Sequence, residues 1–76
     1  MEFEKIKSII SEQLNIAKDK ITMDTSFSED LGADSLDLFQ IISELEGEFD
    51  TEFAIEDVEN ILTVRDAVEY IKDLLD

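Results

Sequence analysis

The sequence has 76 residues, with 21 acidic and 6 basic side chains and a formal net charge of −15 at pH 7. A chain this short buries too little surface to enclose a catalytic centre, and its charge disfavours binding to nucleic acid or to an anionic membrane. It has no Cys and no His, which excludes disulfides, a thiol of its own, the commonest general base and the usual zinc ligands. Because 43% of the residues are hydrophobic, we expect residues 1–76 to form a single folded, acidic, non-catalytic domain.

Helical periodicity dominates the chain. Apolar residues three and four positions apart predict amphipathic helices over about residues 2–15 and 35–49. A short helix is predicted around Ile55, Val58 and Ile61, and a last one follows the N-cap Thr63. The apolar stripe of the last helix consists of Val64, Ala67, Val68, Ile71, Leu74 and Leu75. With no strand or hairpin pattern, the predicted fold is all-α: a small four-helix bundle of three long helices and one short helix.

The first connection of this bundle, residues 16–34, is too long for an ordinary loop of a small domain. Apolar residues are spread along its length: Ile16, Ile21, Met23, Phe27 and Leu31. We therefore expect the long first loop to lie across the core and to be held there by these side chains.

The acidic residues are concentrated in the middle of the chain. From Ile21 to Val64 there are 44 residues with 13 acids and no Lys or Arg. Glu46 and Glu48 occupy the last turn of the second predicted helix, where negative charge costs about 0.3–1 kcal/mol per group against the helix dipole. Acidic residues at a locally unfavourable position indicate a requirement other than folding. The simplest such requirement is a docking surface for basic proteins.

A calcium-binding loop is excluded by the spacing of the acids. An EF-hand requires acids at loop positions 1, 3 and 5 before a glycine at position 6. Neither Gly32 nor Gly47 is preceded by this pattern, so we predict no specific metal site.

One serine occupies a position suited to modification. Ser35 follows Asp34, a good N-cap, and Asp37 lies at the third helical position of a capping box. The Ser35 hydroxyl therefore lies in the first turn, where free N–H groups and the helix dipole favour a phosphate. Leu36 falls about 160° from the core-facing side and is expected to be exposed. By position alone, a serine that only shares in capping is the commoner interpretation.

The run Asp30-Leu31-Gly32-Ala33-Asp34-Ser35-Leu36-Asp37 resembles the prosthetic-group attachment site of acyl carrier proteins of dissociated (type II) fatty acid synthesis. The resemblance covers the whole chain and implies a carrier that is not an enzyme. It implies covalent 4′-phosphopantetheine on Ser35, flanked by Asp34 and Leu36, transferred from coenzyme A by a separate Mg²⁺-dependent transferase. The cofactor thiol would hold growing acyl chains as thioesters in the cytoplasm.

The resemblance also implies partners. These are the basic surfaces of the phosphopantetheinyl transferase, of the fatty acid synthesis enzymes and of acyltransferases, and we expect a monomer that binds no nucleic acid and inserts into no membrane. The predicted docking residues are Leu36, Asp37, Gln40, Glu44, Glu46, Glu48, Glu52 and Glu56. Because burial of a CH₂ group contributes about 0.8 kcal/mol, we expect the acyl chain to be stored inside the bundle. Its predicted lining is Ile42, Leu45, Ile55, Val58, Ile61 and Val68.

Other functions fit part of the sequence. A carrier for polyketide or specialised lipid synthesis is compatible with the same run of residues. Gln40, Ser43, Gly47 and Ala54-Ile55 depart from the common family pattern, which leaves the docking preferences open. An acidic protein-interaction module without a cofactor fits the composition but leaves the surroundings of Ser35 unexplained.

Overall fold

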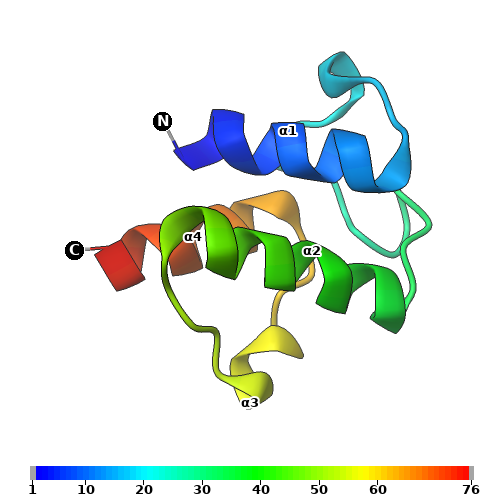
Figure 1. Cartoon of the computed structure of the whole chain (residues 1–76). Coiled ribbons are helices and arrows are strands. Elements are labelled where there is room, and N and C mark those ends of the chain that lie inside the picture. The colour runs from blue at the N-terminus through cyan, green and yellow to red at the C-terminus, as the bar shows by residue number, and fades with distance from the viewer. Residues whose placement is uncertain (1, 76) are drawn as a thin grey trace.

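Long amphipathic stretches form the three main helices, and together with one short helix they make up the bundle in Figure 1. The computed structural model describes residues 2–75. In chain order the elements are α1 (Glu2–Leu14), the 3₁₀ turn η1 (Lys18–Lys20), α2 (Ser35–Phe49), α3 (Ile55–Val58) and α4 (Val64–Leu75). The helix α1 runs in the opposite direction to α2 and α4 (Figure 1). The predicted all-α bundle of three long helices and one short helix is confirmed.

The core lies where α1 packs against both α2 and α4. Its largest fully buried side chains come from these three helices: Ile6, Ile10, Ile41, Leu45, Val64 and Ile71. Each such side chain contributes about 1.5–3 kcal/mol through burial, which makes this contact the main source of stability. The apolar stripe of α4 ends earlier than expected, because Leu74 and Leu75 are 42% and 48% exposed.

The long loop between α1 and α2 lies across the core, as predicted. Ile21 and Phe27 are each only 3% exposed. The other apolar residues of the loop pack against the core as partly buried side chains: Ile16, Met23 and Leu31. The loop is thus an ordered part of the domain.

Backbone hydrogen bonds join this loop to the start of α4, and we call them the loop–α4 seam. The N–H groups of Phe27, Val64 and Arg65 donate to the carbonyls of Leu62 (3.0 Å), Thr25 (2.9 Å) and Met23 (2.9 Å), respectively. The Arg65 guanidinium also pairs with the Asp24 carboxylate at 2.8 Å, which raises the pKa of Arg65. The seam fixes the loop that leads into α2.

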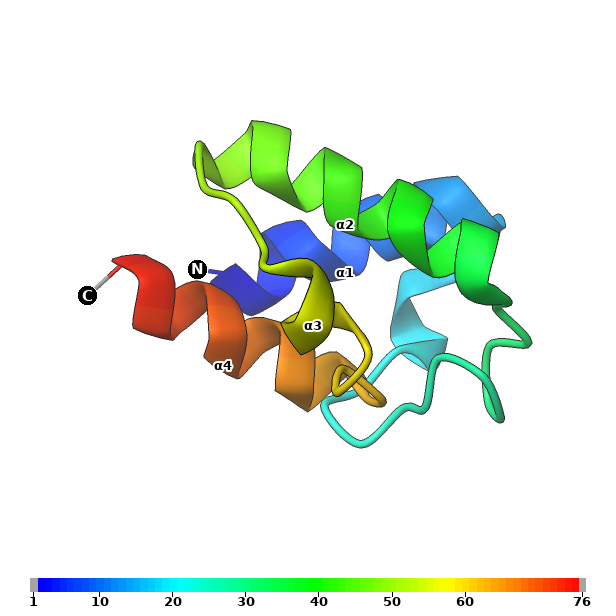
Figure 2. The ribbon, with the colours of Figure 1, turned by 90° about the horizontal axis from the view of Figure 1, so that it is seen from below.

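The short helix α3 is the least supported element. It is a single turn on the side of α2 and α4 that faces away from α1 (Figures 1 and 2). Its N-cap, Ala54, offers no side-chain hydrogen bond, and a helix of this length is not stable by itself. Val58, at the end of α3, is buried, whereas Ile55, at its start, is 72% exposed. The helix itself therefore buries little apolar surface against the domain.

The net charge of −15 leads to a prediction about stability. Raising NaCl from about 10 mM to about 150 mM shortens the Debye length from about 30 Å to about 8 Å, which screens repulsion among the acids. We expect the melting temperature to rise by about 4–8 °C for each kcal/mol of repulsion removed. Calorimetry over this range, repeated with Mg²⁺, checks it; a melting temperature that does not respond to salt would contradict the prediction.

Candidate functional site

A complete capping box forms the N-terminus of α2. The Asp37 N–H donates to Asp34 Oδ1 at 2.9 Å, and the Asp34 N–H donates to Asp37 Oδ2 at 3.4 Å. Gly32 has φ +65°, the left-handed conformation that only glycine adopts without strain, and the Ala33 N–H then donates to the Phe27 carbonyl at 2.8 Å. The cap is made by the two aspartates, so the exposed Ser35 hydroxyl is not part of the capping box.

A pocket of about 360 Å³ opens beside this serine. It lies between the N-terminal half of α2, the end of the long loop and the segment from α3 to α4. Its lining is mainly apolar, with polar groups contributed by Ser28, Asp34, Ser35 and Glu59; the apolar residues are Phe27, Ala33, Leu38, Phe39, Val58, Ile61 and Leu62. An exposed hydroxyl thus adjoins a hollow that suits a hydrocarbon chain.

The predicted lining agrees with this pocket only in part. Val58 and Ile61 line it. Ile42, Leu45 and Val68 are instead buried in the core cluster and do not line this hollow.

The prediction that Ile55 lines the interior is wrong, since this side chain is 72% exposed. The prediction extended a helical periodicity through residues 55–61. The helix is a single turn that ends at Val58, so the pattern does not place Ile55 on the buried side.

Several residues of the pocket were not among the predicted site residues, and the two large exposed apolar ones are Phe39 and Leu62. Phe39 and Leu62 are 47% and 64% exposed and line the pocket. On a helical wheel Phe39 falls about 100° from Leu38, at the edge of the apolar stripe, and that position was a usable signal. Leu62 lies between α3 and α4, where no periodicity applies, and nothing in the sequence distinguished it.

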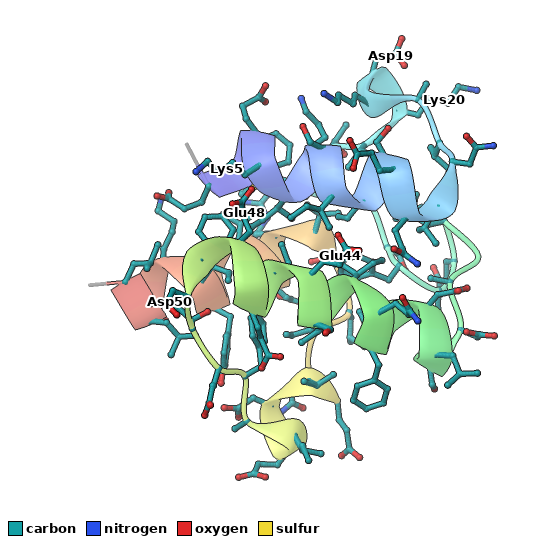
Figure 3. All side chains as sticks on the ribbon, in the orientation of Figure 1. Lys5, Asp19, Lys20, Glu44, Glu48 and Asp50 are labelled. Atoms are coloured by element: carbon teal, nitrogen blue, oxygen red, sulfur yellow. The ribbon has the colours of Figure 1, made fainter. Side chains whose placement is uncertain are left out.

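Several predicted docking residues share the outward face of α2. Leu36 is 76% exposed, and with Gln40 and Glu44 it borders a shallow hollow completed by Phe39 and Ser43. In Figure 3, Glu44 and Glu48 lie along α2 toward Asp50 at its C-terminal end. Two further predicted acids, Glu52 and Glu56, are exposed on the α2–α3 loop and on α3.

Three of the predicted docking residues make contacts within the fold. Glu46 is half-buried, and its Oε2 accepts a hydrogen bond from the Phe53 N–H at 2.8 Å. Asp37 belongs to the capping box, and Gln40 Oε1 accepts from Gln13 Nε2 on α1 at 3.4 Å. A charge reversal at Glu46 or Asp37 would therefore disturb the structure as well as the surface.

Within residues 2–75, no group of three or more acidic side chains is arranged to hold a metal ion. The helices in the same range are too short or too polar to cross a membrane.

Comparison with known proteins gives consistent matches. The model of a family described as the phosphopantetheine attachment site matches residues 4–71. The fold is similar to that of a candidate acyl carrier protein from Mycobacterium tuberculosis, with 38% identity, a TM-score of 0.89, and 96% of this chain and 97% of that chain covered. It is also similar to the acyl carrier protein from Enterococcus faecalis, with 40% identity, a TM-score of 0.82, and coverage of 96% and 92%.

Proposed function

Because this chain belongs to the phosphopantetheine attachment family and resembles its acyl carrier proteins along nearly its whole length, we propose that it carries acyl chains in fatty acid synthesis. Acyl carrier proteins are non-catalytic, and the cofactor of the family is 4′-phosphopantetheine. We assign its attachment to Ser35. The observation that carries the proposal is the exposed Ser35 hydroxyl, outside its own helix cap and beside an apolar pocket.

The residues around Ser35 suit this prosthetic group. The chain has no cysteine, and the bound cofactor would supply the thiol that holds acyl groups as thioesters. Its phosphodiester would lie at the N-terminus of α2, where unpaired N–H groups favour an anion. The carboxylates of Asp34 and Asp37 lie at the same helix end and would repel the phosphodiester, which opposes its tight binding there.

Attachment requires chemistry that this chain does not supply. Ser35 Oγ would form a bond to the phosphorus next to the pantetheine, while the pyrophosphate bond of coenzyme A breaks and adenosine bisphosphate leaves. The hydroxyl proton must go to a base, and the chain contains no histidine to accept it. We propose that a separate transferase provides the base and the Mg²⁺.

The apolar lining of the pocket supports a hydrocarbon cargo. We propose a single carrier domain that acts as a monomer in the cytoplasm, with fatty acid synthesis enzymes and acyltransferases as partners. Mass spectrometry of protein purified from its native cells tests this. Saturated straight-chain acyl groups on Ser35 would support it, oxygenated polyketide chains would favour the alternative pathway, and an unmodified chain would point to a module without cofactor.

Docking is expected to depend on charge on the outward face of α2. Glu44 is exposed and contacts the shallow hollow beside Leu36. Because surface charges steer association, Glu44→Lys should lower kcat/KM of the transferase for this carrier by roughly tenfold at low salt. The deficit should shrink as salt is added.

Glu69→Lys is the matched control, because Glu69 is also exposed but lies on α4. It makes the same charge change away from α2 and should leave the rate within about twofold of the unmodified sequence. Equal rates for the two variants at low salt would show that the α2 face does not guide docking.

A further inference from the structure

The segment from Phe53 to Asp57 includes the two residues before α3 and most of α3 itself. Two side chains from different helices hold it to the bundle. From α2, Glu46 Oε2 accepts the Phe53 N–H at 2.8 Å. From α4, the Tyr70 hydroxyl accepts the Ala54 N–H at 3.2 Å and donates to Asp57 Oδ2 at 2.8 Å. We call these three hydrogen bonds the α3 clamp.

The rings reinforce the clamp. Phe53 and Tyr70 stack with their centroids 4.6 Å apart and an interplanar angle of 23°, and Phe53 is only 8% exposed. The Ala54 N–H lowers the pKa of Tyr70, but the hydrogen bond to Asp57, burial and the nearby acidic charges raise it by more. The hydroxyl therefore stays protonated at neutral pH and continues to donate to Asp57.

The lining of the pocket beside Ser35 comes from two parts of the chain that are held in different ways. Phe27 and Leu62 are joined to each other through the loop–α4 seam. Another part of the lining, which we call the Val58 wall, consists of Val58 and Glu59 at the end of the single-turn helix α3. A wall made from so short an element moves readily unless something outside the helix holds it.

We propose that Tyr70 is a positioning residue that, through the α3 clamp, limits how far the Val58 wall yields and thereby sets the length of acyl chain that the pocket admits. Tyr70 does not line that pocket and acts on it through Ala54 and Asp57. This inference rests on the proposed carrier function and extends it to the selection of cargo by chain length.

Tyr70→Phe tests the inference because it keeps the ring stack and removes only the hydroxyl. In the cofactor-free protein, the Ala54 amide should exchange its hydrogen about two to twelve times faster, the factor protected by a hydrogen bond of ordinary net strength. Acyl groups of increasing length are then loaded enzymatically, and the melting temperature of each form is compared with that of the acetyl form. The rise in melting temperature with chain length should level off at a longer chain in Tyr70→Phe than in the protein without a substitution.

Ile10→Val is the matched control, because Ile10 is fully buried on α1 and removing one methylene destabilises the domain without touching the clamp. Its gain should level off at the original length. Asp57→Ala, which removes the acceptor of the hydroxyl, should shift the limit in the same direction as Tyr70→Phe and serves if the latter does not fold.

The outcomes separate this inference from the proposed function. If the unmodified sequence takes no cofactor, or gains nothing from longer chains, the carrier function or internal storage fails and the inference fails with it. The other case is that longer chains do raise the melting temperature of the protein without a substitution, but the rise levels off at the same chain length in Tyr70→Phe and Asp57→Ala. The clamp then does not set the length, and only this inference is overturned.

Discussion

Ser35→Ala is expected to abolish attachment of 4′-phosphopantetheine while leaving the fold intact. The hydroxyl is the nucleophile in the proposed transfer, and no cap hydrogen bond depends on it because Asp34 and Asp37 form the capping box. A surface substitution of this kind changes stability by no more than about 0.5 kcal/mol. Incubation with coenzyme A, Mg²⁺ and a phosphopantetheinyl transferase, followed by intact-protein mass spectrometry, measures the effect.

Ser28→Ala provides the control for this experiment. Ser28 is exposed and lines the same pocket as Ser35, but it lies in the loop and not at a helix N-terminus. Ser28→Ala should receive the cofactor as fully as the protein without a substitution does. Any cofactor on Ser35→Ala would show that the attachment site has been assigned to the wrong residue.

The second large effect is expected from the acyl chain itself. An octanoyl form should melt well above the acetyl form, because a chain stored in the pocket beside Ser35 would remove CH₂ groups from water at about 0.8 kcal/mol each. Burial of half of the additional methylenes contributes about 2 kcal/mol, which corresponds to about 8–16 °C in a domain of this size. Calorimetry of the two loaded forms measures the difference.

Ile61→Phe should reduce this difference, because Ile61 is 4% exposed and lines the pocket. Ile55→Phe is the control: the same replacement at a side chain that is 72% exposed and lies outside the pocket should leave the difference unchanged. If octanoyl and acetyl forms melt together in the unmodified sequence, the chain is not stored in the bundle.

The sequence predicted the helices well, for physical reasons that particular residues illustrate. The stripe that includes Ile6 and Ile10 on α1 and Ile41 on α2 repeats at helical spacing, and these residues are fully buried. Thr63, the predicted N-cap of α4, exchanges two hydrogen bonds with Asp66, at 3.3 and 3.1 Å. Burial and capping are local consequences of sequence, so pattern alone was sufficient.

The candidate site was predictable only where local rules apply. The capping box and the exposure of Leu36 follow from position on α2. The lining of the pocket does not, because it depends on how the loop and the α3–α4 segment approach α2. For the same reason the structural role of Glu46 was not foreseen: its partner, Phe53, lies beyond the end of the helix, in the α2–α3 loop that no periodicity describes.

The loop–α4 seam has a consequence for the order in which the chain is made. A ribosome synthesises Ser35 and the loop before it ahead of residues 62–65, whose backbone groups complete the seam. Until those residues emerge, the loop lacks the partners that fix its path, and contacts between distant parts of a chain form late in folding. On the proposed carrier function, a transferase that recognises the folded site would meet it only after residues 62–65 have been made, and cofactor loading would follow translation of this region.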